Sequence, residues 1–181
     1  MKVGIVVAVL LSASAEGAAA AGWMAPVAPV IPGADGYVAI PHAAVMPQKT
    51  RIYRAVFNAT LAADRPTEIV PALNMAGSEL NVLAGAGVLP RHARFAVVFH
   101  GAAIDAILDD AHYKARHGVH NPNLKVIADL KRAGVQLFVC GQNLAFANID
   151  PTTLTPDVTV ALDALIVLMT FQENGYALMS Y

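Results

Sequence analysis

The sequence predicts a three-layer α/β domain with a mostly parallel β-sheet. Three short segments are apolar almost throughout and are expected to be strands: RIYRAVFNAT (51–60), ARFAVVFHG (93–101) and VQLFVC (135–140). Stretches with the spacing of amphipathic helices lie between them. Strands that are apolar on both faces are typical of parallel sheets that helices cover on both sides. A chain of 181 residues that is 56% hydrophobic can bury one core of this kind.

The N-terminal segment 1–21 is expected to be a secretory signal peptide. Lys2 precedes an apolar run from Val3 to Leu11, and small residues that suit an A-x-A cleavage site follow. An uncleaved membrane anchor is the alternative, but the run is shorter than the about 20 residues of a spanning helix. We therefore expect a periplasmic or secreted protein that keeps no stable membrane insertion after cleavage.

Residues 22–50 form a Pro/Ala-rich leader ahead of the α/β domain, which is expected over 51–181. The leader contains five prolines and several glycines and alanines. Such a composition is typical of a poorly packed segment that is extended or partly ordered. No chemistry is expected there.

The first helix is expected between the first two strands. Its apolar residues step by three and four, as on one face of an amphipathic helix: Ile69, Leu73, Ala76, Leu80 and Leu83. A helix that began at Pro66 would lose a hydrogen bond at Pro71 in its second turn. We therefore expect the regular helix to begin at Pro71, because proline suits the first helical position.

The remaining elements follow the same alternation. AAIDAILDD (102–110) is expected to be a short helix, and the polar segment 111–123 a loop without hydrophobic periodicity. The next helix is expected to have Asn121 as its N-cap, Pro122 at its first position and Gly134 as its end. A short helix at QNLAFAN, a longer one that ends near Gly175 and a final strand, YALMSY, complete the prediction.

Composition and charge bear on possible partners. The formal charge is -1 and no basic run is present, so a nucleic-acid partner is not expected. The helix around 161–171 is apolar nearly all round, which indicates a central helix or one in a subunit interface. Because only 14% of the residues are charged, we favour an interface and hence a homo-oligomer.

Polar or reactive side chains follow three of the expected strands where each strand ends. Asn58 ends the first strand, His100 follows the second, and Cys140 ends the third. In open parallel sheets, ligands bind at the carboxyl ends of the strands. These residues are therefore expected to line one crevice.

Cys140 is the single cysteine of a chain that is expected to be exported, where cysteines usually occur as disulfide pairs. Gly141 permits a tight turn after it, and a helix is expected to start at Gln142 and Asn143. The free N–H groups of a helix start stabilise a thiolate, and equally the outer sulfur of a persulfide. The alternative is that Cys140 packs as a small apolar side chain.

His112, His117 and His120 lie in the polar segment 111–123, for which three interpretations are open. A metal site is one, although no pair of histidines with helical ligand spacing is present, and we predict no metal. The second is a loop that covers the crevice and contacts an anion through Arg116 or His117. The third is a solvated loop.

Two blocks of the sequence resemble a known family. NPNLKVIADLKRAGVQLFVCGQNLAFANID (121–150) and ALIVLMTFQENGYAL (164–178) resemble the DsrE/DsrF-like family, which is associated with sulfur relay. VHNPN (119–123) followed by CGQ (140–142) resembles its exported single-domain branch. The resemblance covers roughly Tyr53 to Tyr181. It implies a flavodoxin-like sheet of about five strands and homo-oligomers, commonly trimers or hexamers.

The resemblance also implies a role for Cys140. In sulfur-relay members, a cysteine after GV and a short strand accepts sulfur as a persulfide, and Cys140 falls at that position. Relay members are cytoplasmic, whereas this chain is expected to be exported. A relay also needs a second thiol, which another protein or a small molecule has to provide. No cofactor is implied.

Two functional hypotheses therefore remain open. The first is a periplasmic sulfur carrier or sulfurtransferase, in which the N–H groups near Gly141 and Gln142 hold the sulfur anion of Cys140. The second is a non-catalytic oligomeric module that binds a small ligand or anion in the strand-end crevice, with Cys140 merely packed.

Overall fold

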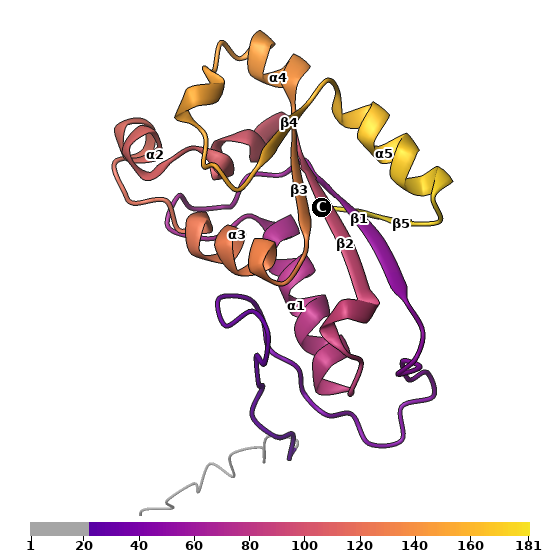
Figure 1. The fold of residues 1–181 in the computed structure, drawn as a ribbon. Helices are drawn as coiled ribbons and strands as arrows, with labels where there is room; N and C mark the ends of the chain where they lie inside the picture. The colour runs from indigo at the N-terminus through magenta and orange to yellow at the C-terminus, as the bar shows by residue number, and fades with distance from the viewer. Residues whose placement is uncertain (1–21) are drawn as a thin grey trace, which may run out of the picture.

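A computed structural model describes residues 22–181 of the chain (Figure 1). The expected signal peptide lies outside these described residues. Five parallel strands form one sheet in the order β4-β3-β2-β1-β5. The strands are β1 (Tyr53–Ala59), β2 (Ala93–Phe99), β3 (Gln136–Cys140), β4 (Thr159–Ala161) and β5 (Ala177–Ser180). The predicted α/β fold with a parallel sheet is confirmed.

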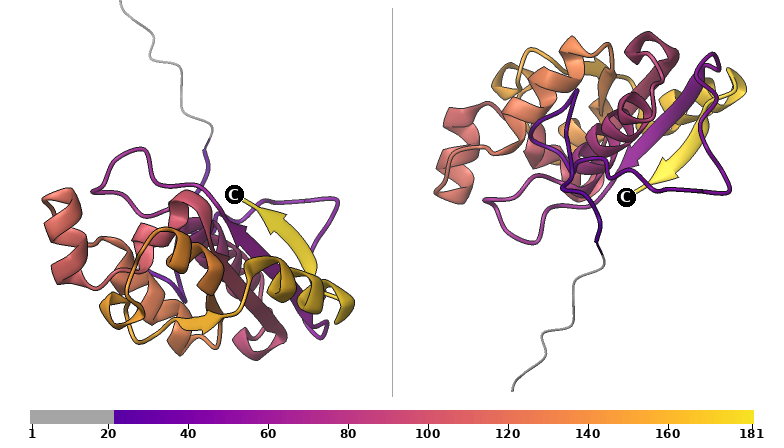
Figure 2. Two further views of the ribbon diagram at one scale, coloured as in Figure 1. Left: turned by 90° about the horizontal axis from the view of Figure 1, so that it is seen from above. Right: turned by 90° about the horizontal axis from the view of Figure 1, so that it is seen from below.

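Helices cover both faces of the sheet, which gives three layers (Figure 2). α1 (Pro71–Gly85) and α3 (Asn123–Arg132) pack on one face, and α5 (Ala164–Glu173) packs on the other. α2 (Asp110–His117) and α4 (Gly141–Phe146) lie near the carboxyl ends of the strands, at the upper end in Figure 1. Short 3-10 helices span Pro90–His92, Gly101–Ile107 and Pro151–Thr153.

Alternation along the strands divides the buried residues into two clusters. Phe57 and Val97 belong to the larger cluster, on the side of α1 and α3. Val56 and Val98 belong to a smaller cluster, with Leu168 of α5. Successive strand residues point to opposite faces, so every second residue of a strand lies on the α5 face.

Most expected elements are present, with ends that differ slightly. α1 begins at Pro71, as predicted. α3 begins at Asn123, so the prediction of Asn121 as N-cap and Pro122 as first helical residue was wrong by one position. Pro122 stands directly before the helix as its N-cap. Asn121, one residue further back, nevertheless makes a capping hydrogen bond, because its Oδ1 accepts the Asn123 N–H at 2.9 Å.

The prediction of a loop over residues 111–123 was wrong, because α2 occupies the first half of this segment. Asp109 caps this helix by accepting the His112 N–H at 2.8 Å, and Gly118 ends it with a φ of 76°. Tyr113 is the buried residue that anchors it. The helix therefore depends on its two ends and one aromatic contact, and a search for hydrophobic periodicity does not detect it.

Part of the leader is ordered and packs against α1. Ile31 is fully buried against α1. The buried side chain of Asn81 accepts N–H groups of Val30 and Ile31 at 3.0 and 2.9 Å, and it donates to the carbonyls of Ile31 and Asp35 at 3.0 Å each. Asn74 of the same helix also bonds to Asp35, so two polar residues of α1 hold the leader in place.

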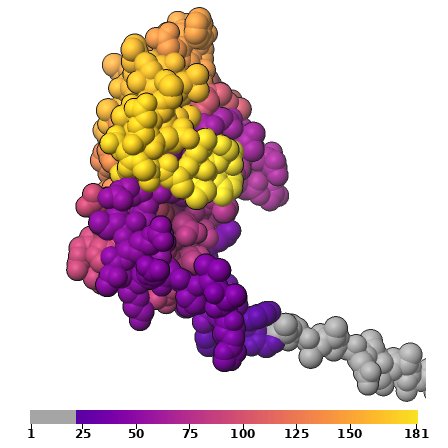
Figure 3. Space-filling model, turned by 90° about the vertical axis from the view of Figure 1, so that its right-hand side faces the viewer, coloured from indigo at the N-terminus to yellow at the C-terminus, as the bar shows by residue number. Residues whose placement is uncertain are grey.

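α5 and β5 leave apolar side chains uncovered in the chain as described (Figure 3). Leu165, Ile166 and Met169 of α5 are exposed, as are Leu178 and Met179 of β5. No helix among the described residues has the length and apolar character required to cross a membrane.

Candidate functional site

Three of the predicted site residues lie at the carboxyl edge of the sheet on its α5 face. Cys140 belongs to the buried cluster on that face, together with Val98, two residues before His100. Asn58 is the register partner of Val98 on the neighbouring strand. Because strand side chains alternate, Asn58, His100 and Cys140 emerge on the same side.

Cys140 is both the last residue of β3 and the N-cap of α4. Its Sγ accepts the backbone N–H of Asn143 at 3.4 Å and donates to Asp163 Oδ1 at 3.7 Å. The residue is 5% exposed. The thiol thus has one hydrogen-bond donor and one carboxylate acceptor within reach.

Asp163 is a site residue that our reading of the sequence missed. It caps α5, because its Oδ1 accepts the N–H of Leu165 at 3.0 Å, and the same oxygen accepts the Cys140 thiol. An aspartate directly before the apolar run ALIVLM is a signature of a helix N-cap, so the sequence contained a signal for its structural role. Its position beside the cysteine depends on the fold.

His100 forms a hydrogen bond with Asn58 at this edge of the sheet. Its Nε2 lies 2.6 Å from Asn58 Oδ1, a geometry in which Nε2 carries the proton and donates it, leaving Nδ1 as an acceptor. Burial lowers the pKa of His100 below its ordinary value, and the negative charge of Asp163 acts in the opposite direction. The Asp163 carboxylate is therefore electrostatically linked to His100 as well as bonded to Cys140.

The N–H groups near Gly141 and Gln142 were expected to face the sulfur of Cys140, and the structure differs from this expectation at Gln142. The Gln142 N–H donates to the carbonyl of Leu162 at 3.3 Å, so it is directed at β4's end and not at the sulfur. The N–H that contacts Sγ is that of Asn143, whose side-chain oxygen in turn accepts the N–H of Gly101. Gly141 is needed here because a Cβ would lie 2.7 Å from the carbonyl oxygen of Ala161.

Arg116 and His117 lie elsewhere. Both bind the carboxylate of Asp105, His117 at 3.0 Å, and His117 lines a hollow on the α1 side of the sheet together with Pro66. Among the described residues, neither side chain forms a hydrogen bond or ion pair with Cys140. The structure thus does not bring these two residues to the cysteine.

The histidines of the 111–123 segment do not converge on one point. Each pairs with a different carboxylate: His112 with Asp109, His117 with Asp105, and His120 with Asp110. Residues 22–181 contain no group of three or more His, Cys, Asp or Glu side chains that could hold a metal ion.

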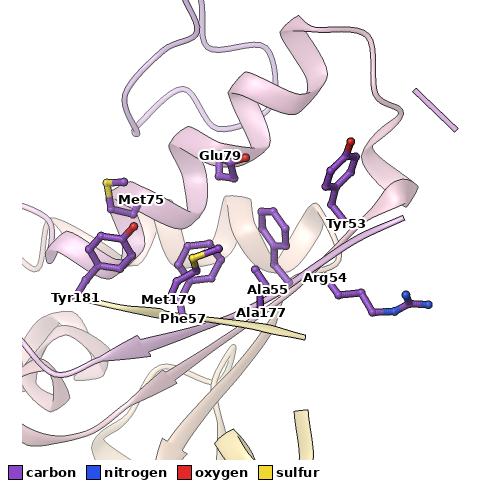
Figure 4. A pocket seen from close by; sticks show the side chains of 10 residues that line it. Tyr53, Arg54, Ala55, Phe57, Met75, Glu79, Ala177, Met179 and Tyr181 are labelled. Carbon is purple, nitrogen blue, oxygen red and sulfur yellow. The ribbon is translucent and has the colours of Figure 1, made fainter. Parts of the chain in front are cut away.

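An apolar cavity of about 180 Å³ lies on the opposite face of the sheet, between α1 and the edge formed by β1 and β5 (Figure 4). Phe57, Met75, Met179 and Tyr181 line it, and Glu79 projects into it from α1. Burial raises the pKa of Glu79 above its ordinary value. Cys140 is not among the residues that line this cavity.

Comparisons with known proteins agree with this architecture. The DsrE/DsrF-like family model matches residues 49–181. A protein of unknown function, MTH1491 from Methanobacterium thermoautotrophicum, is 19% identical, with a TM-score of 0.52, over 71% of this chain and 99% of that chain. The ychN protein from E. coli is 15% identical, with a TM-score of 0.49, over the same shares. No curated protein matches the chain.

Proposed function

Because the chain belongs to the DsrE/DsrF-like family, which is associated with sulfur relay, we propose that it carries sulfane sulfur as a persulfide on Cys140. The observation that supports this best is the environment of the thiol. Sγ lies at the carboxyl edge of the sheet between one N–H donor, from Asn143, and one carboxylate acceptor, from Asp163.

The loading step uses a low-molecular-weight persulfide or polysulfide as donor. Cys140 Sγ forms a bond with the outer sulfur of the donor, R–S–S⁻, while the bond between the two donor sulfurs breaks. The thiol releases its proton to water before Sγ attacks, and the departing R–S⁻ takes up a proton from water. The products are the Cys140 persulfide anion and R–SH, with no net oxidation or reduction.

The unloading step needs a thiol from outside the chain, because Cys140 is the only cysteine. The thiolate of the acceptor attacks the outer sulfur, and Cys140 leaves as a thiolate that regains a proton. The N–H of Asn143 stabilises the sulfur anion in both steps. We place this exchange in the periplasm or outside the cell, on the basis of the expected signal peptide.

A homo-oligomer, a trimer or hexamer, is part of the same proposal. The exposed apolar residues of α5, Leu165, Ile166 and Met169, support burial of this helix against another copy. α5 also holds Asp163 at its N-terminus, so an interface there would fix the carboxylate that contacts the cysteine.

The test is mass spectrometry of the intact protein after incubation with polysulfide and removal of excess donor. Wild type is expected to gain the mass of one sulfur atom, and Cys140→Ser none. Subsequent incubation with a small thiol should return wild type to its original mass. A wild-type protein that gains no sulfur while folded would overturn the proposal.

A second candidate is a non-catalytic module that binds a small ligand or anion. Its supporting observation is the 5% exposure of Cys140, which is typical of a packed cysteine. This candidate predicts that folded wild type takes up no sulfur and that Cys140→Ser retains the oligomer and its ligand.

A further inference from the structure

Two arginines occupy directly opposed positions at the amino end of the sheet. Arg54 of β1 and Arg94 of β2 are register partners on adjacent strands, and both side chains are exposed. They lie an even number of residues before Val56 and Val98, which places them on the α5 face. Figure 4 shows Arg54 directed away from the cavity on the α1 side.

Like charges directly opposite each other on neighbouring strands destabilise a sheet. Within residues 22–181, neither arginine forms an ion pair, whereas Arg65, Arg116 and Arg132 each have a carboxylate partner. The pair is thus an unfavourable arrangement that a bound anion would relieve.

Few acidic residues share the chain segments that hold the pair; Glu173, in the last turn of α5, is a nearby exception. The chain has no aspartate or glutamate between Asp35 and Asp64, or between Glu79 and Asp105. These two stretches include both arginines and also contribute Lys49, Arg51 and Arg91. The formal net charge of -1 does not show this local basic character, because the acidic residues lie in other segments of the chain.

A hollow of about 380 Å³ lies at the pair, bounded by the end of α5. Its other lining residues are Thr170, Phe171, Asn174 and Tyr176. Thr170 and Asn174 direct their donors at helix carbonyls, at 2.8 Å each. The two guanidinium groups therefore remain as the charged donors available to a ligand.

We propose that this hollow binds a tetrahedral dianion of the phosphate or sulfate class between Arg54 and Arg94. Guanidinium groups match the oxygens of such anions with paired N–H donors, and two of them balance a double negative charge. The ligand is either the free ion or the phosphomonoester headgroup of a lipid, which can also carry two negative charges. The site is at the opposite end of the sheet from Cys140, so the proposal is independent of sulfur transfer.

The first experiment is calorimetric titration of the chain with inorganic phosphate and with sulfate, at an ionic strength held constant with chloride. Wild type should bind with millimolar or stronger affinity. Arg54→Gln and Arg94→Gln should each weaken binding at least about tenfold, because each removes a charge-assisted contact. Arg65→Gln is the matched control and should bind as wild type does.

A stability measurement separates a binding role from a structural one. Arg54 and Arg94 lie beside the end of α5, where a cation also favours the helix dipole. For a binding pair, Arg94→Gln should unfold in phosphate-free chloride at the same temperature as wild type or higher, and should lose the stabilisation by phosphate. A lower unfolding temperature without phosphate, together with no phosphate binding by wild type, would show that the arginines only support α5.

Co-sedimentation with vesicles distinguishes the two sources of the anion. Binding to vesicles that contain phosphatidic acid but not to phosphatidylcholine vesicles, lost in both variants and in excess phosphate, would identify a lipid headgroup. Phosphate binding without vesicle binding would identify the free ion. The proposal is wrong if wild type binds neither phosphate nor the anionic vesicles. In that case a change in self-association of the variants would indicate that carboxylates of another copy occupy the hollow.

Discussion

Replacing Asp163 with asparagine removes the negative charge beside the Cys140 thiol and leaves the helix cap in place. Asparagine caps helices about as well as aspartate, so its side-chain oxygen can still accept the N–H of Leu165. The variant therefore isolates the electrostatic effect of the carboxylate. Asp163→Ala is the comparison, because it removes both the charge and the cap.

The size of the effect follows from the separation of the two groups. A unit charge at the 3.7 Å between Sγ and Asp163 Oδ1 opposes a thiolate by ~1.1 kcal/mol even at the dielectric constant of water, and by more where water is excluded. That energy corresponds to about sevenfold more thiolate in Asp163→Asn at a pH where the thiol predominates. Asp163→Ala should in addition lose about 1 kcal/mol of stability with its cap.

The assay is the rate of alkylation of Cys140 by iodoacetamide, followed by intact mass between pH 6 and pH 9. Asp163→Asn should react at least about sevenfold faster than wild type near neutral pH, and the ratio of the two rates should fall as the pH rises toward 9. An asparagine variant that reacts no faster than wild type at neutral pH would refute the reasoning.

Three further predictions concern stability and assembly. Asn81→Ala should lower the free energy of unfolding by about 2–4 kcal/mol and expose residues 22–37 to protease, because the side chain makes four hydrogen bonds to the leader; urea denaturation and limited proteolysis measure both effects. Glu79→Gln should unfold at a slightly higher temperature than wild type at pH 7 and at the same temperature below about pH 4, because a carboxyl pKa that burial raises in the folded state makes stability fall as pH rises above the ordinary glutamate pKa. The difference should be small because the Glu79 side chain is still exposed to solvent. Leu165→Glu should reduce the molar mass in light scattering to that of a smaller assembly, whereas an unchanged mass would place the subunit interface elsewhere.

The sequence was sufficient for those features that depend on local pattern. Pro71 marks the start of α1, and the apolar runs mark the strands, because both signals lie within a few residues of the feature they predict. The grouping of Asn58 and His100 followed from strand ends in a parallel sheet. The 3-residue strand β4 was missed, since it is too short and too exposed to show a pattern.

Features that depend on distant partners were out of reach. Asp163 contacts Cys140 across 23 residues of chain, and Asn81 holds Ile31 across 50. The opposition of Arg54 and Arg94 requires the register of β1 against β2, which no local pattern contains. Arg116 and His117 were expected at the crevice because they are polar, but Asp105 lies nearer to them and binds both.

The central claim is that a small sulfur donor reaches Cys140 in the folded protein, although the residue is only 5% exposed. The most direct test is the rate of iodoacetamide labelling of Cys140 in increasing, sub-denaturing urea. The account predicts labelling that is faster than global unfolding and nearly independent of urea, because only a local opening at the strand end is needed. Labelling that occurs at the unfolding rate and rises with urea as steeply as unfolding would contradict it.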